Sequence, residues 1–365
     1  MQKIQVNLPE RNYDIIIGGG LLGNIGSNIV SLKAGRTCVI ITDDKVGSLY
    51  AQQVNRSLAD AGFVVNIITL RQGEENKNLS NVEYCYHQML SLGLDRKSFV
   101  VALGGGLIGD LAGFVAATYM RGIRFFQVPT TLLAAVDASI GGKTGVNLRE
   151  GKNLIGAFHQ PEAVFIDVET FKTLHNREIL SGLAEILKHG LIFDEMLYSY
   201  LVNNIMGILK LDAHHLEHII SESCRIKARI VEQDEHEEGI RACLNFGHTI
   251  GHAIESLSIE KGIPYRHGEA VSIGMVIALE ISSRLGHLNP AKVREIIDFI
   301  KSTGLPENCH NIKPEEIIYR MRVDKKIIEG KLRFVLLKNI GEPFIADNIP
   351  IEIVAETVKA RCMNA

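Results

Sequence analysis

The spacing of hydrophobic residues changes between the two halves of the chain. In the first half, short β-branched and aromatic runs alternate with segments of helical periodicity, as in strands joined by crossover helices. This alternation predicts a parallel sheet with helices packed on it. The runs that we predict to be strands are 14–17, 37–42, 64–68, 99–103, 125–128 and 163–167.

From about residue 176, longer segments with a 3.6-residue period take over. They predict two domains, a Rossmann-like α/β domain over residues 1–175 and a mostly helical domain over 176–365. A cleft between domains commonly holds a small-molecule site, so we expect the active site there. The second domain is predicted to contain helices over 178–191, 213–231, 242–257, 269–285 and 293–303, and one strand over 331–337.

Composition narrows the class of protein. The 365 residues are 46% hydrophobic and 22% charged, which suits globular domains, and the net charge of −3 excludes nucleic-acid binding through bulk positive charge. The beginning lacks a signal pattern, and the longest apolar run, 100–120, is broken by Gly104, Gly105, Gly106 and Asp110. We therefore expect a cytoplasmic protein without a membrane span. The six cysteines contain no CxxC pair and predict free thiols.

Two glycine-rich loops follow predicted strands and match the pattern G-x-G-x-x-G. Such loops let a pyrophosphate approach the backbone at a helix N-terminus. Asp43 lies 20 residues beyond the first loop, where it could bind a ribose hydroxyl, and tight turns are the alternative for either loop alone. The loop glycines are Gly18, Gly20 and Gly23 in the first loop and Gly104, Gly106 and Gly109 in the second.

The stretch DASIGGKTGVN contains the GKT of a P-loop at Gly142, Lys143 and Thr144. That motif also requires a glycine five residues before Gly142, where this chain has Asp137. Nucleotide hydrolysis is therefore disfavoured.

Histidines and carboxylates on predicted helices suggest a metal site. His248 and His252 are four residues apart on one helical face, although the segment lacks the glutamate of HExxH. His267 precedes another apolar helix, and Glu185 and Lys188 share a face of a third. Spacing alone favours His248 with His252 as the ligand pair, and hydrogen-bonded helix histidines are the alternative.

Several cations stand beside glycine or asparagine where helices begin or loops turn. Each alone is typical of a solvated surface, but together they predict a site for phosphate and carboxylate oxygens. The set comprises Arg121, Lys143, Lys152 with Asn153, Arg241 with Asn245, and Lys325 with Lys326.

Taken together, the motifs identify a family resemblance. GGGLIGDLAGFVA, RGIRFFQVPTTLLAAVDASIGGKTGVN, GKNLIGAF, GLAEILKHG, LNFGHTIGHAIE, HGEAVSIGM and DKK occur in the order found in the 3-dehydroquinate synthase family. The chain resembles that family from about Gln5 to its end. The resemblance implies conversion of 3-deoxy-D-arabino-heptulosonate 7-phosphate to 3-dehydroquinate and phosphate in the shikimate pathway. It also implies catalytic NAD and a divalent metal, zinc or cobalt.

The implied reaction passes through oxidation of a hydroxyl by NAD, β-elimination of phosphate, re-reduction, ring opening and aldol closure. The resemblance assigns the metal to Glu185, His248 and His267, and makes His252 a substrate contact instead of a ligand. It assigns NAD contacts to Asp43, Gly73, Glu74, Lys77, Gly105, Gly106, Gly109, Asp110, Thr130, Thr131, Lys143, Lys152 and Thr173. Under this assignment the first glycine loop no longer binds the pyrophosphate.

The resemblance also implies the residues around the substrate. Lys152 would lie near the nicotinamide, Glu237 would orient Arg241, and Arg121 would reach the phosphate in a neighbouring subunit, which implies a homodimer. Substrate contacts are expected at Asp137, Lys143, Asn153, Lys188, Lys227, Arg241, Asn245, His252 and one of Lys325 or Lys326.

Three rival functions share parts of this pattern. Other sugar-phosphate cyclases, such as valiolone or deoxy-inosose synthases, use substrates without this carboxylate, so Lys227 with Arg241 favours dehydroquinate synthesis. A metal-dependent polyol dehydrogenase would accumulate NADH. A non-catalytic NAD-binding regulator would have no use for the metal and anion-binding groups.

Overall fold

The computed structural model describes residues 1–9, 11–263, 265–323, 327–328 and 331–363. The chain forms two compact units. The first contains residues 1–174 together with 211–236, and the second contains 175–210 together with 237–365. Helix α8 (Ala213–Gln233) therefore belongs to the first unit, where it packs against β1 and β2, although it follows residue 175.

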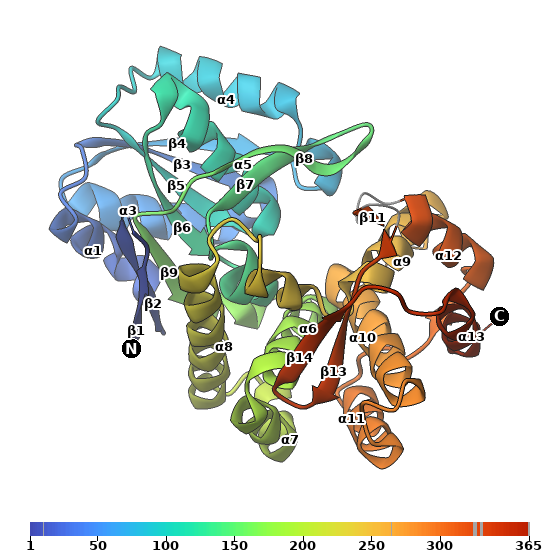
Figure 1. Cartoon of the computed structure of the whole chain (residues 1–365). Coiled ribbons are helices and arrows are strands. Elements are labelled where there is room, and N and C mark those ends of the chain that lie inside the picture. Colours follow the sequence, from blue (N-terminus) through green and yellow to red (C-terminus); the bar gives the residue numbers. More distant parts are fainter. Residues whose placement is uncertain (10, 264, 324–326, 329–330, 364–365) are drawn as a thin grey trace. The chain divides into compact units, whose positions relative to one another are not determined.

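A seven-stranded sheet in the order β1-β2-β9-β6-β5-β3-β4 forms the centre of the first unit (Figure 1). All neighbouring strands are parallel except β1 and β2. The six predicted strands are confirmed, whereas the antiparallel edge strand β1 was not predicted. The strands are β1 (Gln2–Asn7), β2 (Asn12–Gly18), β3 (Thr37–Asp43), β4 (Val64–Leu70), β5 (Phe99–Gly104), β6 (Arg124–Pro129) and β9 (Ala163–Asp167).

Helices cover both faces of this sheet because its central strands are hydrophobic on both sides. Val39 and Ile41 of β3 pack in one core with α4 and α5. Cys38 and Ile40, which point the other way, pack in a second core with α1 and α3. The helices of this unit, besides α8, are α1 (Ile25–Ser31), α2 (Asp44–Val46), α3 (Gln52–Asp60), α4 (Leu79–Ser91) and α5 (Gly106–Thr118).

The GGKTG stretch forms part of an antiparallel hairpin of β7 (Lys143–Leu148) and β8 (Gly151–Phe158), which was not predicted. The strands approach closely at Gly145 and Gly156. A Cβ on Gly156 would lie 2.1 Å from the carbonyl oxygen of Thr144, so the close approach requires glycine. The GKT sequence is therefore the start of a strand and not a P-loop.

The second unit is mostly helical, with short two-stranded sheets. The predicted helix 242–257 is wrong at its beginning. Residues Ile240–Asn245 form a 3-10 helix, and Gly247, with φ +78°, separates it from α9. The helices are α6 (Asn176–Phe193), α7 (Glu195–Leu209), α9 (His248–Glu260), α10 (His267–Arg284), α11 (Pro290–Ser302), α12 (Pro314–Val323) and α13 (Ile351–Arg361).

The single strand predicted over 331–337 is also wrong, because the run is divided at Arg333. Its first part pairs with one short strand, and its longer part forms a hairpin with a strand that was not predicted. The strands of this unit are β10 (Cys309–His310), β11 (Ile327–Ile328), β12 (Lys331–Leu332), β13 (Phe334–Asn339), β14 (Glu342–Ala346) and β15 (Cys362–Met363).

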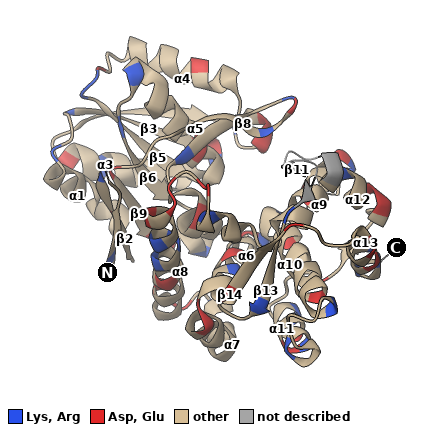
Figure 2. Cartoon of the chain, in the orientation of Figure 1, with Lys and Arg blue, Asp and Glu red and all other residues tan. Residues whose placement is uncertain are grey.

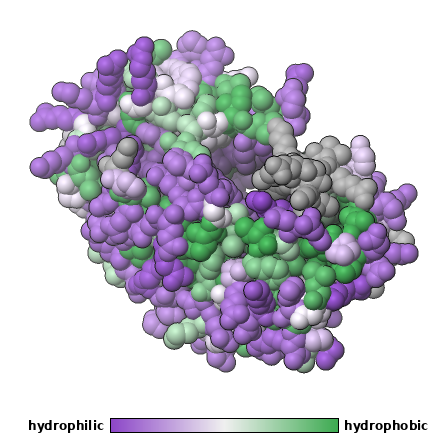
Figure 3. Space-filling view, viewed as in Figure 1, coloured by the Kyte–Doolittle hydropathy of each residue, from purple (hydrophilic) through white to green (hydrophobic). Residues whose placement is uncertain are grey.

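Charged and hydrophilic residues are spread over the surface, as the small net charge leads one to expect. Positive and negative residues are interspersed on both units (Figure 2), and hydrophilic residues cover most of the face seen in Figure 3. All six cysteines are free, as predicted, and the structure buries them. Among the described helices, none is both long enough and apolar enough to cross a bilayer.

Candidate active site

Three helices of the second unit approach one another closely through glycines. A Cβ on Gly268 of α10 would lie 2.2 Å from the carbonyl oxygen of Ser181 on α6. A Cβ on Gly274, also on α10, would lie 2.0 Å from the carbonyl oxygen of Gly247, at the start of α9. Since α10 contacts both other helices without intervening side chains, polar groups on all three can reach one point.

Glu185, His248 and His267 converge at that point. The Oε1 atom of Glu185 lies 3.6 Å from Nε2 of His248 and 3.5 Å from Nε2 of His267. Glu185 is fully buried, yet its Oε1 has no hydrogen-bond partner among the described residues. A buried carboxylate oxygen without a partner is costly unless a ligand completes its environment.

The outer nitrogens of the two imidazoles are already engaged. Nδ1 of His248 lies 3.1 Å from the carbonyl oxygen of Phe246, and Nδ1 of His267 lies 3.0 Å from Oε2 of Glu255. With Nδ1 as the donor in each ring, both Nε2 atoms face Glu185. Two imidazole nitrogens and one carboxylate oxygen are the ligand set of many catalytic zinc sites, so these residues fit a divalent metal.

Burial and neighbouring charges both shift the pKa values of this cluster. Burial favours a neutral Glu185, but Lys188 and the two histidines hold its pKa well below the usual value. Burial, followed by the charge of Lys188, lowers the pKa of His248 well below the usual value. Burial would also lower the pKa of His267, but the neighbouring carboxylates of Glu185 and Glu255 raise it to about 10. His248 is therefore neutral, while the ring of His267 is positively charged when no metal is bound.

The remaining predicted residues of α6 and α9 lie around this cluster. Lys188, nearly inaccessible to solvent, donates a hydrogen bond to Oε2 of Glu185. His252 does not join Glu185 as the spacing of His248 and His252 suggested. It lies in an overlapping group with Glu255 and His267, its ring centroid 5.2 Å from that of His248. The structure therefore brings together the ligands implied by the resemblance.

The predicted substrate contacts Arg241 and Asn245 lie in the segment before α9. Arg241 is buried on the 3-10 helix, and Nδ2 of Asn245 donates to Oε1 of Glu237 at 2.8 Å. Glu237 has a left-handed backbone with φ +62°. Orientation of Arg241 by Glu237 stays a prediction. Lys325 and Lys326 lie outside the described residues.

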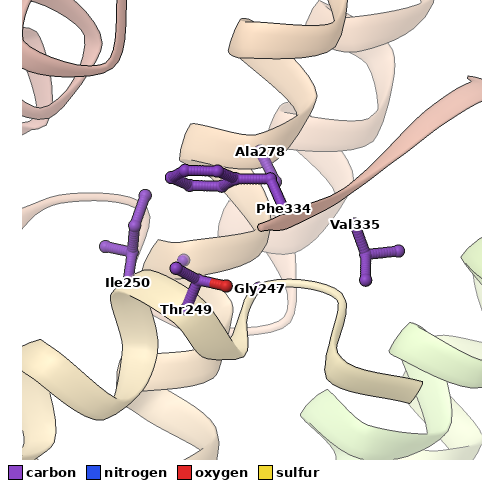
Figure 4. A pocket seen from close by; sticks show the side chains of 7 residues that line it. Gly247, Thr249, Ile250, Ala278, Phe334 and Val335 are labelled. Carbon is purple, nitrogen blue, oxygen red and sulfur yellow. The ribbon is translucent and has the colours of Figure 1, made fainter. Parts of the chain in front are cut away.

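A small, open pocket of about 170 Å³, solvent included, lies beside the beginning of α9 (Figure 4). Most of its lining is apolar, and none of the lining side chains titrates. Because it offers no acid, base or charged ligand, we interpret it as a packing gap beside the cluster. The lining residues are Gly247, Thr249, Ile250, Gly274, Ala278, Phe334 and Val335.

In the first unit, the second glycine loop has the geometry of a phosphate-binding turn. It joins the end of β5 to α5, which begins at Gly106 and has no side-chain cap. A Cβ on Gly109 would lie 2.8 Å from Gln127, which explains the third glycine as a close contact of helix and sheet. Oγ1 of Thr130, at the end of the neighbouring strand, is buried and has no partner within the described part of the chain.

The first glycine loop is occupied by a protein carboxylate. Asp167, at the end of β9, accepts hydrogen bonds from the backbone nitrogens of Gly20 at 2.9 Å and Leu22 at 3.0 Å. These are amides that a pyrophosphate would need. The loop is therefore a structural turn, in agreement with the resemblance.

Predicted cofactor and substrate residues meet between the second loop and the hairpin. Nζ of Lys77 donates to Asp110 at 2.5 Å and to Oδ1 of Asn153 at 2.6 Å. Asn147 links the same group, since it donates to Glu74 at 2.8 Å and accepts from the backbone of Asn153 at 2.9 Å. Burial raises the pKa of Asp110, and Lys77 offsets part of that increase.

Lys227 and Asp137 form a second charged pair in the first unit. Lys227 projects from α8, is only 5% exposed, and donates to both the carboxylate and the carbonyl oxygen of Asp137. By contrast, Lys143 and Lys152 are exposed on the hairpin strands. Substrate contact by these residues stays a prediction.

The other predicted cofactor residues lie at strand ends and turns. Asp43 ends β3, and its Oδ1 accepts from the backbone nitrogens of Lys45 and Val46. Thr173 shares a 2.6 Å hydrogen bond with the hydroxyl of Tyr50. Gly73 has φ +118° before a short 3-10 turn, and Thr131 follows β6.

Arg121 lies in a strained turn. Met120, Arg121 and Gly122 have φ values of 48°, 71° and 111°, so two side-chain-bearing residues adopt left-handed backbones in succession. Such conformations are unfavourable and cluster at functional sites. The turn exposes Arg121 at the surface of the first unit.

The fold and the histidine–carboxylate cluster define a two-unit α/β and helical protein with a candidate metal site. The 3-dehydroquinate synthase N-terminal model matches residues 67–181, and the C-terminal model matches residues 182–327. A 3-dehydroquinate synthase from Pelotomaculum thermopropionicum is 46% identical over 99% of this chain and 97% of its own length. A 3-dehydroquinate synthase from Thermodesulfovibrio yellowstonii is 45% identical over 98% of this chain and 99% of its own length. The chain belongs to the 3-dehydroquinate synthase family.

Solved structures show the same architecture. A 2-deoxy-scyllo-inosose synthase complexed with carbaglucose-6-phosphate, NAD+ and Co2+ matches with a TM-score of 0.89 at 27% identity, covering 99% of this chain and all of the other. A 2-epi-5-epi-valiolone synthase from Streptomyces hygroscopicus subsp. jinggangensis with NAD+ and Zn2+ bound has a TM-score of 0.87 at 26% identity, covering 97% and 98%. A probable glycerol dehydrogenase from Sinorhizobium meliloti, 16% identical with a TM-score of 0.69 and covering 95% of each chain, shares the fold alone.

Sequence reasoning missed two residues that organise these groups. Glu255 follows His248 by seven residues and His252 by three, so helical spacing alone placed it on the same face. Asn147 gave no comparable signal, because its role depends on the hairpin that was not predicted.

Proposed function

We propose that this protein catalyses the 3-dehydroquinate synthase reaction, releasing phosphate from 3-deoxy-D-arabino-heptulosonate 7-phosphate and closing the carbocycle. The proposal rests chiefly on the buried Oε1 of Glu185, which faces two imidazole nitrogens and has no hydrogen-bond partner among the described residues. Glu185, His248 and His267 would hold zinc or cobalt. When bound, the metal would supply a Lewis acid for substrate hydroxyls.

The chain's own residues would bind and orient the substrate. Lys188 fixes one oxygen of Glu185 and so directs the other toward the imidazoles. Arg241, Asn245 and Lys227 offer charged or amide donors for carboxylate and phosphate oxygens. The hairpin of the first unit offers Lys143, Lys152 and Asn153 as further polar groups.

NAD would bind at the second glycine loop. The free backbone amides at the beginning of α5 suit a pyrophosphate, and the hydroxyl of Thr130 offers a further donor. Asp43, at the end of β3, is suited to a ribose hydroxyl. NAD would be regenerated in each cycle, because the product has the oxidation level of the substrate.

We also propose a cytoplasmic homodimer. The exposed, strained turn at Arg121 supports this arrangement, since its guanidinium could reach a phosphate bound by another subunit. The dimer would then complete each phosphate site.

A comparison of substrates tests the proposed function. With zinc and NAD, the heptulosonate phosphate should release phosphate at least 100-fold faster, by kcat/KM, than a hexose 6-phosphate that lacks the carboxylate. Arg241→Met should reduce this preference by weakening the carboxylate substrate selectively. Faster turnover of the hexose phosphate would instead assign the chain to another cyclase specificity.

A further inference from the structure

We propose that Glu255 is a positioning residue that holds His267 in the tautomer and orientation needed to bind the metal. This inference rests on the proposed metal site. It concerns the hydrogen bond between Oε2 of Glu255 and Nδ1 of His267, on the side of the ring away from Glu185.

The placement of Glu255 follows from helix geometry. His248, His252 and Glu255 are at positions i, i+4 and i+7 of α9 and share one face. His267 is the first residue of α10. Its Nδ1 lies 3.0 Å from Oε2 of Glu255, and its Nε2 lies 3.5 Å from Oε1 of Glu185. The ring is thus held between two carboxylates, one at each nitrogen.

The two imidazoles differ in what orients them. His248 uses the carbonyl oxygen of Phe246, a backbone acceptor that no side-chain substitution removes. His267 uses a carboxylate, only 16% exposed, which strengthens the ring as a ligand as well as fixing its tautomer. Of the two rings, only His267 therefore depends on a side chain for its outer hydrogen bond.

Charge gives a second, independent reason for a carboxylate at this position. The negative charge of Glu185 is paired with Lys188, so the ligands alone bring little net negative charge to a divalent metal. His267 also lies at the N-terminus of α10, where the helix dipole disfavours positive charge. Glu255 supplies the negative charge that offsets both effects.

Zinc affinity of Glu255→Gln measures the contribution of this carboxylate. Glutamine can accept the Nδ1 hydrogen bond without the charge, so we expect 10- to 100-fold weaker zinc binding in competition with a chromophoric chelator, and a larger loss in Glu255→Leu. Cobalt spectra should show unchanged coordination number, because Glu255 is not itself a ligand. Glu260→Gln, on the same helix but paired with Arg320, should bind zinc as the unchanged protein does.

The outcomes separate this inference from the metal site itself. If Glu185→Gln binds zinc normally, the proposed site is wrong. If Glu185→Gln loses zinc while Glu255→Gln and Glu255→Leu bind it within twofold of the unchanged protein, the site stands and the role of Glu255 is refuted. A change of cobalt coordination number in Glu255→Gln would make Glu255 a ligand and also refute positioning.

Histidine ¹⁵N NMR of the unchanged zinc protein tests the proposal directly. A variant is needed only to assign the resonances of His267. His267 should carry its proton on Nδ1, with the shift of a strongly hydrogen-bonded donor, and bind zinc through Nε2. A proton on Nε2 of His267 would contradict the proposal.

Discussion

The proton on His267 is the one that a divalent metal must displace. In the metal-free protein, the effect of burial is outweighed by the carboxylates of Glu185 and Glu255, and the pKa of His267 is raised to about 10. The ring is therefore charged at pH 8, while His248 is neutral. Zinc binding at pH 8 should release about one proton, and affinity should increase with pH until about 10. Calorimetry in two buffers of different ionisation enthalpy measures this release, and zinc binding without it would contradict the assignment.

Lys188 should stabilise the metal-free protein more than the zinc-bound protein. Lys188→Met leaves the fully buried Glu185 carboxylate without its cation, which should lower the free energy of unfolding by about 3–5 kcal/mol. Bound zinc would supply the missing positive charge and recover part of this loss. Denaturant unfolding with and without zinc tests the prediction, with Lys172→Met, in an exposed pair with Glu169, as the control. Equal losses in both states would contradict it.

At the residue level, sequence spacing identified the right kinds of side chain but not their partners. His248 and His252 are neighbours on one helix, so periodicity paired them, whereas His267 is brought to His248 by the close packing of α9 and α10. Such a tertiary contact leaves no trace in local spacing. His267 and Glu185 were already candidates from their predicted helices, and the family resemblance made them ligands. The contact of Glu255 became visible only in the structure.

The two glycine loops should respond differently to substitution. Gly20→Ala places a side chain at φ +72° and should cost about 1 kcal/mol of stability, but NAD affinity should stay within twofold because Asp167 already binds this loop. Gly105→Val adds atoms beside Thr131 at the beginning of α5 and should weaken NAD binding at least tenfold. Fluorescence titration with NADH measures both affinities, and equal losses would mean that the loops had been assigned wrongly.

Among the elements, the buried parallel strands were predictable and the chain reversals were not. β3 and β5 are continuous hydrophobic runs between helical segments, which is a strong local signal. The β7–β8 hairpin contains glycine, lysine and asparagine, and its pairing depends on the contact of Gly145 with Gly156. The beginning of α9 depends on the left-handed backbone of Gly247, which hydrophobic periodicity does not reveal.

For the whole molecule, a shared phosphate site makes a complementation experiment decisive. If Arg121 acts in the partner's site, mixtures of inactive Arg121→Ala and inactive Lys143→Ala subunits should form dimers with one intact site. About a quarter of the specific activity should return after subunit exchange, because half of the dimers are mixed and each has one of two sites restored. Mixing either variant with itself is the control. No recovery after verified exchange would place Arg121 in its own subunit's site or outside the site.

The most direct test of the central claim is the stoichiometry of NAD in a complete turnover. The zinc-loaded protein is supplied with the heptulosonate phosphate and a hundredfold smaller amount of NAD, while phosphate, carbocycle and NADH absorbance are followed together. Phosphate and 3-dehydroquinate should accumulate in equal amounts, far exceeding the NAD supplied, without a steady rise of NADH. NADH that increases one for one with product, or turnover that stops when the NAD is reduced, would show a dehydrogenase and contradict the account.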